Sequence, residues 1–235
     1  MFQRIYNSIF SPMPLNDFDG YDAYWAQRIT DGIPEVLPRF AWIAARIPKG
    51  ASVVDVGCGN GAFLAYLKSR NPTLSLFGVD IAEAAIKCLK QCGISGAQID
   101  GTTSLRNLVG HDVDTAVVME VLEHVGEAEV LFKEVLALNP KQIFVTIPNA
   151  GYLIHRLRLM FGGRFPVTAI AYHVKEHLRF WTVKDFRQWA AAMGCDVVAC
   201  VGQEWRREPL RRFIIRRFPE LFAAQVIFEI VPKMR

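Results

Sequence analysis

The sequence predicts an α/β fold in which helices cover both faces of a mostly parallel sheet. Short apolar runs alternate with amphipathic stretches such as "GAFLAYLKSR" and "EAAIKCLKQC", which is typical of consecutive βαβ units. Most of the runs are nearly continuous in apolar residues, as expected of strands buried on both faces. The predicted strands lie at residues 52–57, 74–80, 97–100, 114–119, 142–148, 196–201 and 225–231.

Two regions depart from this alternation. Residues 1–45 precede the first strand and are predicted to form a helical segment, because "YDAYWAQRI" and "LPRFAWIAARI" are amphipathic. Residues 46–235 are predicted to form one domain, in which residues 149–182 make a long connection after the fifth strand. Such connections are usually lids or substrate walls. No clear amphipathic helix separates the last two runs, so we expect the final strand to return antiparallel at the sheet's edge.

The composition favours a cytoplasmic protein. No stretch reaches the roughly 20 uninterrupted apolar residues of a membrane span, and the N-terminus is too polar for a secretory signal. The five cysteines show no CxxC spacing, which favours a reducing compartment.

The net charge of +4 is unevenly distributed, because the segment at residues 205–217 is strongly basic. Such a patch attracts phosphates, anionic lipid headgroups or nucleic acid, although a solvated helix face explains it equally well. Joined to the basic amphipathic stretch at residues 152–165, it would suit a phosphate-bearing or lipid-linked substrate at the inner face of a membrane. Nucleic acid is disfavoured because aromatic residues do not interleave with the basic run. The arginines of the segment are Arg206, Arg207, Arg211, Arg212, Arg216 and Arg217.

The strongest motif is "VVDVGCGNGAF" at residues 53–63. A buried strand ends there, and three glycines then form a turn that leads into a helix and lets a ligand approach the backbone closely. Dinucleotide-binding folds use a similar loop. Asp55, however, lies two residues before the first glycine, where the dinucleotide fingerprint is usually apolar. An acid there suits a cationic or amino-acid-bearing ligand.

Two further acids follow the next strands. Asp80 ends the second predicted strand, where a carboxylate can accept both hydroxyls of a ribose. A helix N-cap is the alternative role for Asp80. Asp100 ends the third strand, where an acid can meet an adenine amino group. The three acids therefore indicate a nucleoside ligand at consecutive strand ends.

Together, the glycine loop, Asp80, Asp100 and "MEVLEHV" (residues 119–125) resemble a class I S-adenosylmethionine-dependent methyltransferase over roughly residues 45–230. The resemblance implies a Rossmann-like sheet of seven strands, the last antiparallel, and S-adenosylmethionine as cofactor. By the same implication Asp55 and the glycines surround the methionine end, Asp80 binds the ribose, and Asp100 binds the adenine amine. The implied cofactor-binding residues are Asp55, Gly57, Cys58, Gly59, Gly61, Asp80, Ile81, Asp100, Gly101 and Met119.

The stretches "IFVTIPNAGYLIHRLRLMFGGRFPVT" and "EHLRFWTVKDFRQW" are similar to the MetW-like group within that superfamily. Bacterial relatives of this shape are associated with cell-surface polysaccharide assembly. The sequence therefore predicts an O-methyltransferase acting on a hydroxyl of a saccharide or glycolipid-type acceptor. One rival is a quinone-type catechol or another small molecule as acceptor. Another is a non-catalytic regulatory subunit that binds the cofactor, because MetW-like proteins can act as partners of another enzyme.

"MEVLEHV" raises the question of a metal ion. The spacing of its two glutamates and its histidine places them on one face of a helical turn, and "YHVKEHLRFWT" adds His173 and His177. The pattern E-x-x-E-H, P-N and H-x-x-F/W-T resembles small-RNA 2′-O-methyltransferases and ubiquinone-biosynthesis O-methyltransferases. It implies a divalent cation, with Mg²⁺, Mn²⁺, Fe²⁺, Co²⁺ and Zn²⁺ all compatible. The implied ligands are Glu120, Glu123, His124 and His177.

The same residues can also be explained without a metal ion. Glu120 would then face the cofactor and His124 would cap or pack, while His124 or His177 would act as general base on the acceptor hydroxyl. The catalytic candidates are therefore Glu120, His124 and His177. We expect His111 and His155 to be surface residues.

Overall fold

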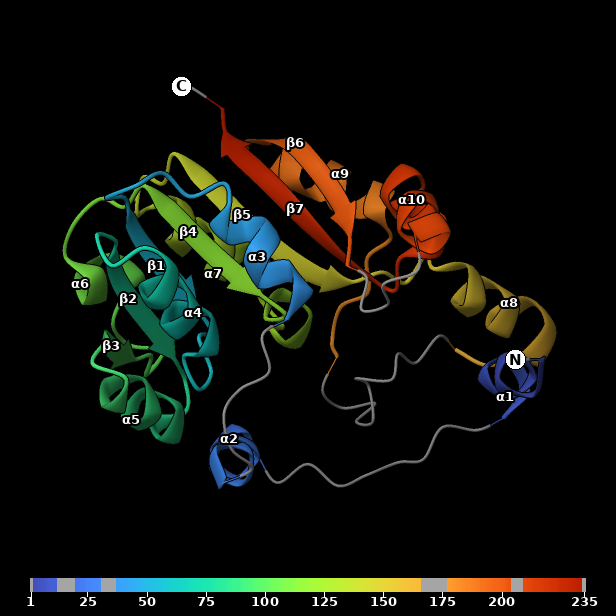
Figure 1. Cartoon of the computed structure of the whole chain (residues 1–235), viewed down its shortest axis with the longest axis horizontal. Helices are drawn as coiled ribbons and strands as arrows, with labels where there is room; N and C mark the ends of the chain where they lie inside the picture. The colour runs from blue at the N-terminus through green and yellow to red at the C-terminus, as the bar shows by residue number, and fades with distance from the viewer. Residues whose placement is uncertain (1, 12–19, 31–36, 166–176, 204–208, 234–235) are drawn as a thin grey trace.

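The computed structural model describes residues 2–11, 20–30, 37–165, 177–203 and 209–233. It contains a seven-stranded sheet in the order β3-β2-β1-β4-β5-β7-β6 (Figure 1), which confirms the predicted fold class. The five strands from β3 to β5 are parallel, and β7 is antiparallel to both of its neighbours. The strands are β1 (Ser52–Val56), β2 (Ser75–Asp80), β3 (Ser95–Gln98), β4 (Thr115–Met119), β5 (Gln142–Pro148), β6 (Cys195–Gly202) and β7 (Gln225–Pro232).

The expected position of the last strand is wrong. β7 is antiparallel as predicted, but it lies between β5 and β6, and β6 forms the edge. In that position β7 pairs along nearly its whole length with both neighbours. Its backbone groups are thereby satisfied, and Val226, Phe228 and Ile230 are buried in the core. An edge position would leave one side of this apolar strand without partners.

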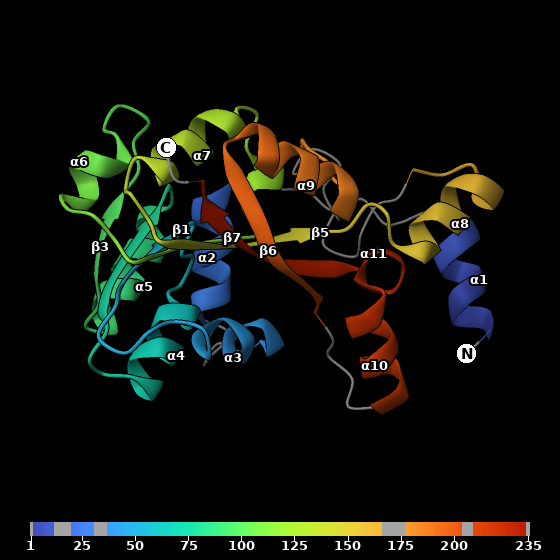
Figure 2. The ribbon, with the colours of Figure 1, turned by 90° about the horizontal axis from the view of Figure 1, so that it is seen from above.

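The sheet separates two apolar cores (Figure 2). Along β5, Ile143, Val145 and Ile147 face one core and Phe144 faces the other, because successive side chains of a strand point to opposite faces. The first core is closed by α6 (Leu105–Val109), α7 (Ala128–Leu136) and α9 (Val183–Ala192). The second is closed by α3 (Pro38–Ala44), α4 (Ala62–Arg70) and α5 (Glu83–Gln91).

The remaining helices lie outside this three-layer arrangement. α1 (Phe2–Phe10) packs on α8 (Leu153–Gly162), which occupies the long connection after β5, and α2 (Tyr21–Thr30) packs on α5. α10 (Pro209–Arg217) and α11 (Pro219–Phe222) lie between β6 and β7, where the sequence indicated no clear helix. None of the described helices has the length and apolar character needed to cross a membrane.

Candidate functional site

The glycine turn lies between β1 and α4, at the carboxyl edge of the sheet. Gly57, Gly59 and Gly61 all have positive φ angles, of 76°, 52° and 76°. The backbone N–H groups of Gly57 and Cys58 donate to the carbonyl of Val79, at 2.8 and 3.0 Å, and tie the turn to β2. A Cβ on Gly57 would lie 2.2 Å from Cγ2 of Val121, so the turn directly contacts the segment that follows β4. Only glycine fits at this contact.

Asp55 lies below this turn and is 1% exposed. Neither carboxylate oxygen has a hydrogen-bond partner among the described residues. Burial, reinforced by the charge of Asp80 and opposed by that of Arg39, raises the pKa of Asp55 to about 8. A buried acid without partners is costly, so this site favours a ligand that brings a positive charge.

Asp80 is buried at the end of β2 and holds the turn from the other side. Its Oδ2 accepts from the Gly59 N–H at 2.8 Å, and its Oδ1 accepts from the Ala82 N–H at 2.9 Å. Burial raises the pKa of Asp80, and these backbone donors oppose the rise. Asp80 is not the N-cap of α5, which is Ala82. Next to it, the apolar Ile81 side chain is 51% exposed.

Asp100 follows β3 and is exposed. Its Oδ1 accepts from the N–H groups of Thr102 and Thr103 at 2.8 and 3.0 Å, which lowers the pKa of its carboxyl. Gly101 has a φ of 76°, with open space where a Cβ would be. Asp100 is therefore a preorganised anionic acceptor on the same sheet edge as Asp80.

Met119 ends β4 and is half-buried, and Glu120 follows it with a φ of 54°, which few residues other than glycine adopt. The carboxylate of Glu120 accepts hydrogen bonds from Thr146 Oγ1 and Gln225 Nε2, each at 2.8 Å. Burial raises the pKa of Glu120, while Arg39 and these two donors lower it. Glu120 is thus held toward β5 and β7.

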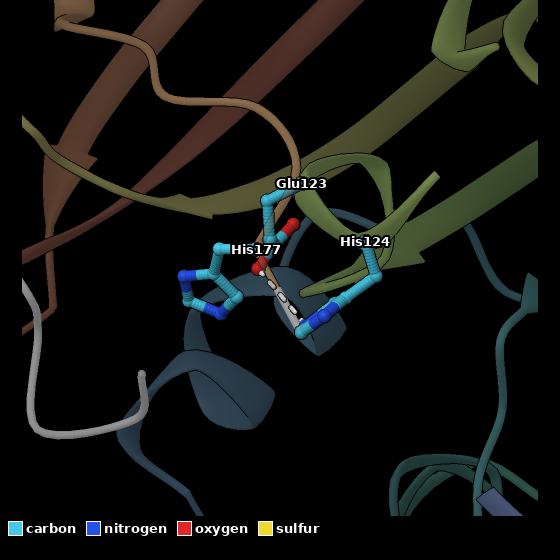
Figure 3. Close-up of side chains that lie close together, drawn as sticks. All are labelled: Glu123, His124 and His177. Atoms are coloured by element: carbon cyan, nitrogen blue, oxygen red, sulfur yellow. Dashed lines mark ion pairs between the residues drawn. The ribbon is translucent and has the colours of Figure 1, made fainter. Parts of the chain in front are cut away.

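Three other predicted ligands converge (Figure 3). One potential ligand atom from each of Glu123, His124 and His177 lies within 4.8 Å of the others, and no other such group occurs in the described part of the chain. His124 Nε2 lies 3.8 Å from Glu123 Oε1, and the two imidazole rings are 4.6 Å apart. Two ligands at about 2.1 Å from one ion lie at most about 4.2 Å apart, so small side-chain adjustments would bring the three atoms within reach of one ion. Glu120 is not part of this group.

The fold brings His177 to this position through the backbone. Glu123 and His124 lie in the short helix η1 (Leu122–His124) after β4. The carbonyl of Glu123 accepts from the N–H groups of Leu178 and Arg179, at 2.7 and 3.1 Å. His177 is 4% exposed, and its Nε2 has no hydrogen-bond partner among the described residues. Burial, with the neighbouring charge of His124, lowers the pKa of His177 to about 4, so the ring is neutral at pH 7. His173 lies outside the described residues.

Helix α2 lies over both parts of the site, which the sequence did not predict. A Cβ on Gly59 would be 2.4 Å from Cη2 of Trp25, so the indole covers the glycine turn. Tyr21, four residues earlier, makes a T-shaped ring contact with His124, with ring centroids 6.2 Å apart. The aromatic spacing in "YDAYWAQRI" was the available signal, but it could not show which surface these rings cover. One helix thus joins the glycine turn to the Glu123, His124 and His177 cluster.

Comparison with known proteins identifies the family. Residues 38–230 match the family model described as "MetW: Methionine biosynthesis protein MetW". The chain belongs to the MetW family. It is 28% identical over 152 residues to the bifunctional methionine biosynthesis protein MetXA/MetW of Rhodopirellula baltica, covering 60% of this chain and 24% of that protein. It is 29% identical over 173 residues to a small RNA 2′-O-methyltransferase of Arabidopsis thaliana, covering 63% and 18%. The chain therefore spans about a quarter or less of the length of both relatives.

A ubiquinone biosynthesis O-methyltransferase of Pseudomonas putida is 27% identical over 164 residues, covering 60% of this MetW-family chain and 69% of that enzyme. Among solved structures, a methyltransferase of Thiobacillus denitrificans in complex with S-adenosyl-L-homocysteine superposes with a TM-score of 0.58 and 18% identity, covering 90% and 98% of the two chains. These similarities confirm that the MetW-family chain has a Rossmann-like methyltransferase fold.

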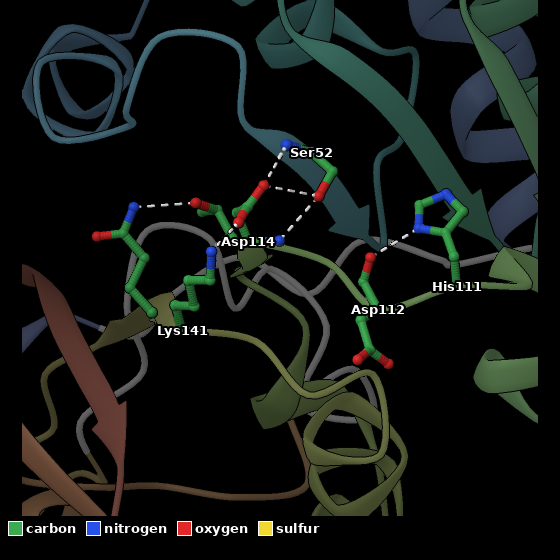
Figure 4. Close-up of polar contacts among 7 residues, drawn as sticks. Ser52, His111, Asp112, Asp114 and Lys141 are labelled. Atoms are coloured by element: carbon green, nitrogen blue, oxygen red, sulfur yellow. Dashed lines mark hydrogen bonds and ion pairs between the residues drawn. The ribbon is translucent and has the colours of Figure 1, made fainter.

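Elsewhere in the MetW-family chain, polar clusters are structural. At the amino edge of the sheet, Asp114 accepts from the Ser52 N–H and Oγ at 2.9 and 3.0 Å and pairs with Lys141 Nζ at 2.7 Å (Figure 4). These contacts tie β1, β4 and β5 together. His111 is exposed and contacts the Asp112 carbonyl, which confirms its predicted surface position.

The surface prediction for His155 is wrong. His155 is 7% exposed, because α8 packs it beneath the loop that follows β5. Its Nδ1 lies 3.3 Å from the carbonyl of Asn149, and its ring contacts Tyr152. Burial lowers the pKa of His155 to about 4. Its neighbours are thus a backbone carbonyl and a tyrosine ring, typical of a core histidine.

Proposed function

We propose that this chain is an S-adenosylmethionine-dependent O-methyltransferase whose acceptor is a hydroxyl with a second oxygen beside it, as in a saccharide or glycolipid. The main support is that the glycine turn after β1 and a largely buried cluster of one carboxylate and two imidazoles after β4 lie at adjacent strand ends. Gly57 contacts Val121, two residues before Glu123. In parallel α/β sheets, ligands bind where the strand order reverses, which here is between β1 and β4.

The described residues fit the cofactor. Asp55 offers two buried oxygens to an ammonium group, and the glycine turn, with Val121 against Gly57 and Trp25 against Gly59, would border the cofactor. Asp80 has a carboxylate at the ribose position, and Ile81 offers an exposed apolar surface for adenine. The chemistry supplied by S-adenosylmethionine is an activated methyl group, which a well-aligned nucleophile can take directly. The protein's task is therefore alignment and deprotonation of the acceptor.

The described residues also fit a divalent cation. Glu123, His124 and His177 would hold it, and a set of one oxygen and two nitrogens suits Mn²⁺, Fe²⁺, Co²⁺ or Zn²⁺ as well as Mg²⁺. The chemistry supplied by such an ion is Lewis acidity, which lowers the pKa of an alcohol and orients neighbouring oxygens. His177 contributes a neutral imidazole, because burial keeps its pKa near 4. Without an ion, the same nitrogen can accept the proton of the acceptor hydroxyl.

Two alternative functions, a different acceptor and a non-catalytic role, each have an observation in their favour. Similarity to the ubiquinone biosynthesis O-methyltransferase favours a catechol, which also presents two adjacent oxygens. The other alternative is a subunit that binds the cofactor and regulates another enzyme, as the resemblance of the sequence to MetW-like proteins implies. The Glu123, His124 and His177 cluster, in which Glu123 and His177 are buried, argues against the second alternative, because cofactor binding alone does not require it.

The test is release of S-adenosylhomocysteine from S-adenosylmethionine with a saccharide diol, a catechol or no acceptor, before and after a chelator. We expect diol-dependent release that the chelator abolishes and Mn²⁺ restores. His177→Ala is expected to be inactive, whereas His111→Ala, the exposed histidine, retains full activity. Turnover with the catechol alone would move the acceptor to the quinone class. Cofactor binding without turnover on any acceptor would contradict the proposal and favour a regulatory subunit.

A further inference from the structure

We propose that α1, α8 and α10 form a docking face that binds the surface of an anionic phospholipid bilayer. This surface, called the docking face below, comprises the outward side chains of these helices and of the adjoining Arg164, Phe165 and Phe218. Membrane binding through the docking face requires none of the chemistry of the methyl-transfer site. The apolar exposure, the charge and the position of the three helices favour it.

The α1–α8 part of the docking face is a fixed unit. Arg158 of α8 is 3% exposed, and its Nη1 donates to the carbonyls of Ser8 and Ser11, both at 2.9 Å. It thereby caps the C-terminal end of α1. A Cβ on Gly162 would lie 2.3 Å from the carbonyl oxygen of Ile9, so the backbones of the two helices approach closely. Their outward side chains therefore keep a defined arrangement.

The docking face carries most of the exposed large apolar side chains in the described residues. In α10 only Ile215 is buried, while Leu210 and Phe213 are 71% and 63% exposed. On α8, Met160 and Phe161 are 70% and 63% exposed. Large apolar side chains exposed in such number at one end of a molecule mark an interaction site. The full set is Ile5, Tyr6, Phe10, Leu159, Met160, Phe161, Phe165, Leu210, Phe213 and Phe218.

The charge of the docking face points to an anionic partner. The sequences of α1, α8 and α10 contain no aspartate or glutamate. Arg212, Arg216 and Arg217 of α10 are exposed, as is Arg164 after α8. Arginines beside exposed phenylalanine, leucine and methionine are the composition of helices that lie in a membrane interface. A protein partner would need a surface that is both acidic and apolar. An anionic bilayer has both properties over its whole surface, because anionic headgroups cover an apolar interior.

The docking face lies at the same edge of the sheet as the candidate site, the edge at which the parallel strands end. α8 follows the carboxyl end of β5, and α10 follows the carboxyl end of β6. Figures 1 and 2 place α1, α8 and α10 together at one end of the molecule. Docking there would bring the carboxyl edge of the sheet toward the membrane, where a lipid-linked acceptor would be reached.

The experiment is co-sedimentation of the full chain with vesicles of phosphatidylcholine alone or with about 30 mol % phosphatidylglycerol. We expect binding to the anionic vesicles only, weakened by about 0.5 M NaCl. Leu210→Ser with Phe213→Ser is expected to weaken it at least about tenfold, and Arg212→Gln with Arg216→Gln about 25-fold. Circular dichroism and melting temperature confirm that each variant is folded.

Matched controls lie outside the docking face. Val130→Ser with Val198→Ser removes side chains that are 55% and 56% exposed, and Lys90→Gln with Lys133→Gln removes two exposed charges on α5 and α7. We expect both control pairs to bind like the unmodified protein. The proposal is overturned if anionic vesicles are not bound, or if controls and test variants bind alike. It is also overturned if the docking face instead mediates a dimer that Leu210→Ser with Phe213→Ser dissociates.

Discussion

Binding of S-adenosylhomocysteine beside Asp55 is expected to release a proton near neutral pH. Burial raises the pKa of the ligand-free Asp55 to about 8, so about nine-tenths of the molecules carry this proton at pH 7. A ligand ammonium next to the carboxyl favours the charged form and lowers its pKa well below about 6, toward its ordinary value of 3.8. Release should therefore be about 0.9 proton per ligand at pH 7, about 0.5 at pH 8 and about 0.1 at pH 9.

Isothermal titration calorimetry in phosphate and in Tris measures this number, because the two buffers differ in ionisation enthalpy. Asp55→Asn cannot release the proton and corrects for any change in the ligand's own amine. Methylthioadenosine, which lacks the amino-acid part, provides the second control and should release no proton from the unmodified protein. Equal release by the protein and Asp55→Asn, or by both ligands, would refute the assignment of Asp55 to the ammonium group.

Three further predictions concern other parts of the molecule. Asp114→Asn should lower the free energy of unfolding by about 1–2 kcal/mol at pH 7. The pKa of Asp114 is lowered to about 2 in the folded protein, so its carboxylate stabilises the fold fully above about pH 4. The difference between the variant and the unmodified protein should therefore vanish as the pH falls toward 2. Urea titrations at both pH values measure it, and an equal deficit at pH 2 would contradict the charge-based reasoning. His177→Ala should weaken Co²⁺ binding, followed by visible absorption, at least about tenfold, with His111→Ala unchanged; equal affinities would exclude His177 as a ligand. Trp25→Phe should remove most of the tryptophan fluorescence change on S-adenosylhomocysteine binding, because this indole covers Gly59; a full change would place the reporter elsewhere.

Strand positions followed from the sequence where burial imposes a pattern. β5 is buried on both faces and matches its predicted range, residues 142–148, at both ends. β3 lies at residues 95–98 rather than 97–100, because this edge strand has no buried residue that would fix the apolar pattern. α10 was missed for a related reason, since it buries only Ile215 and so lacks an apolar stripe facing a core.

In the candidate site, local motifs were predictable and long-range contacts were not. Asp55, the glycine turn and Asp80 lie together because a short motif and two neighbouring strands place them there. The contact of Trp25 with Gly59 joins residues far apart in the sequence and depends on where α2 packs. The spacing of "MEVLEHV" assumed a helical turn that includes Glu120. The helical turn begins only at Leu122, and the positive φ of Glu120 directs its carboxylate away from the cluster.

The sequence predicted the wrong position for β7 and wrongly included Glu120 among the metal ligands. Both errors have the same structural cause, the pairing of β7 with β5. Because β7 pairs with β5, Gln225 lies opposite Pro148, two positions beyond Thr146 along the same strand. Both side chains then reach the end of β4 and donate to Glu120 at 2.8 Å. With β7 at the sheet edge, Gln225 would be one strand away and Glu120 would lack this donor. A partly buried carboxylate is stabilised by such donors, so the pairing of β7 with β5 holds Glu120 away and leaves Glu123 for the His124 and His177 cluster.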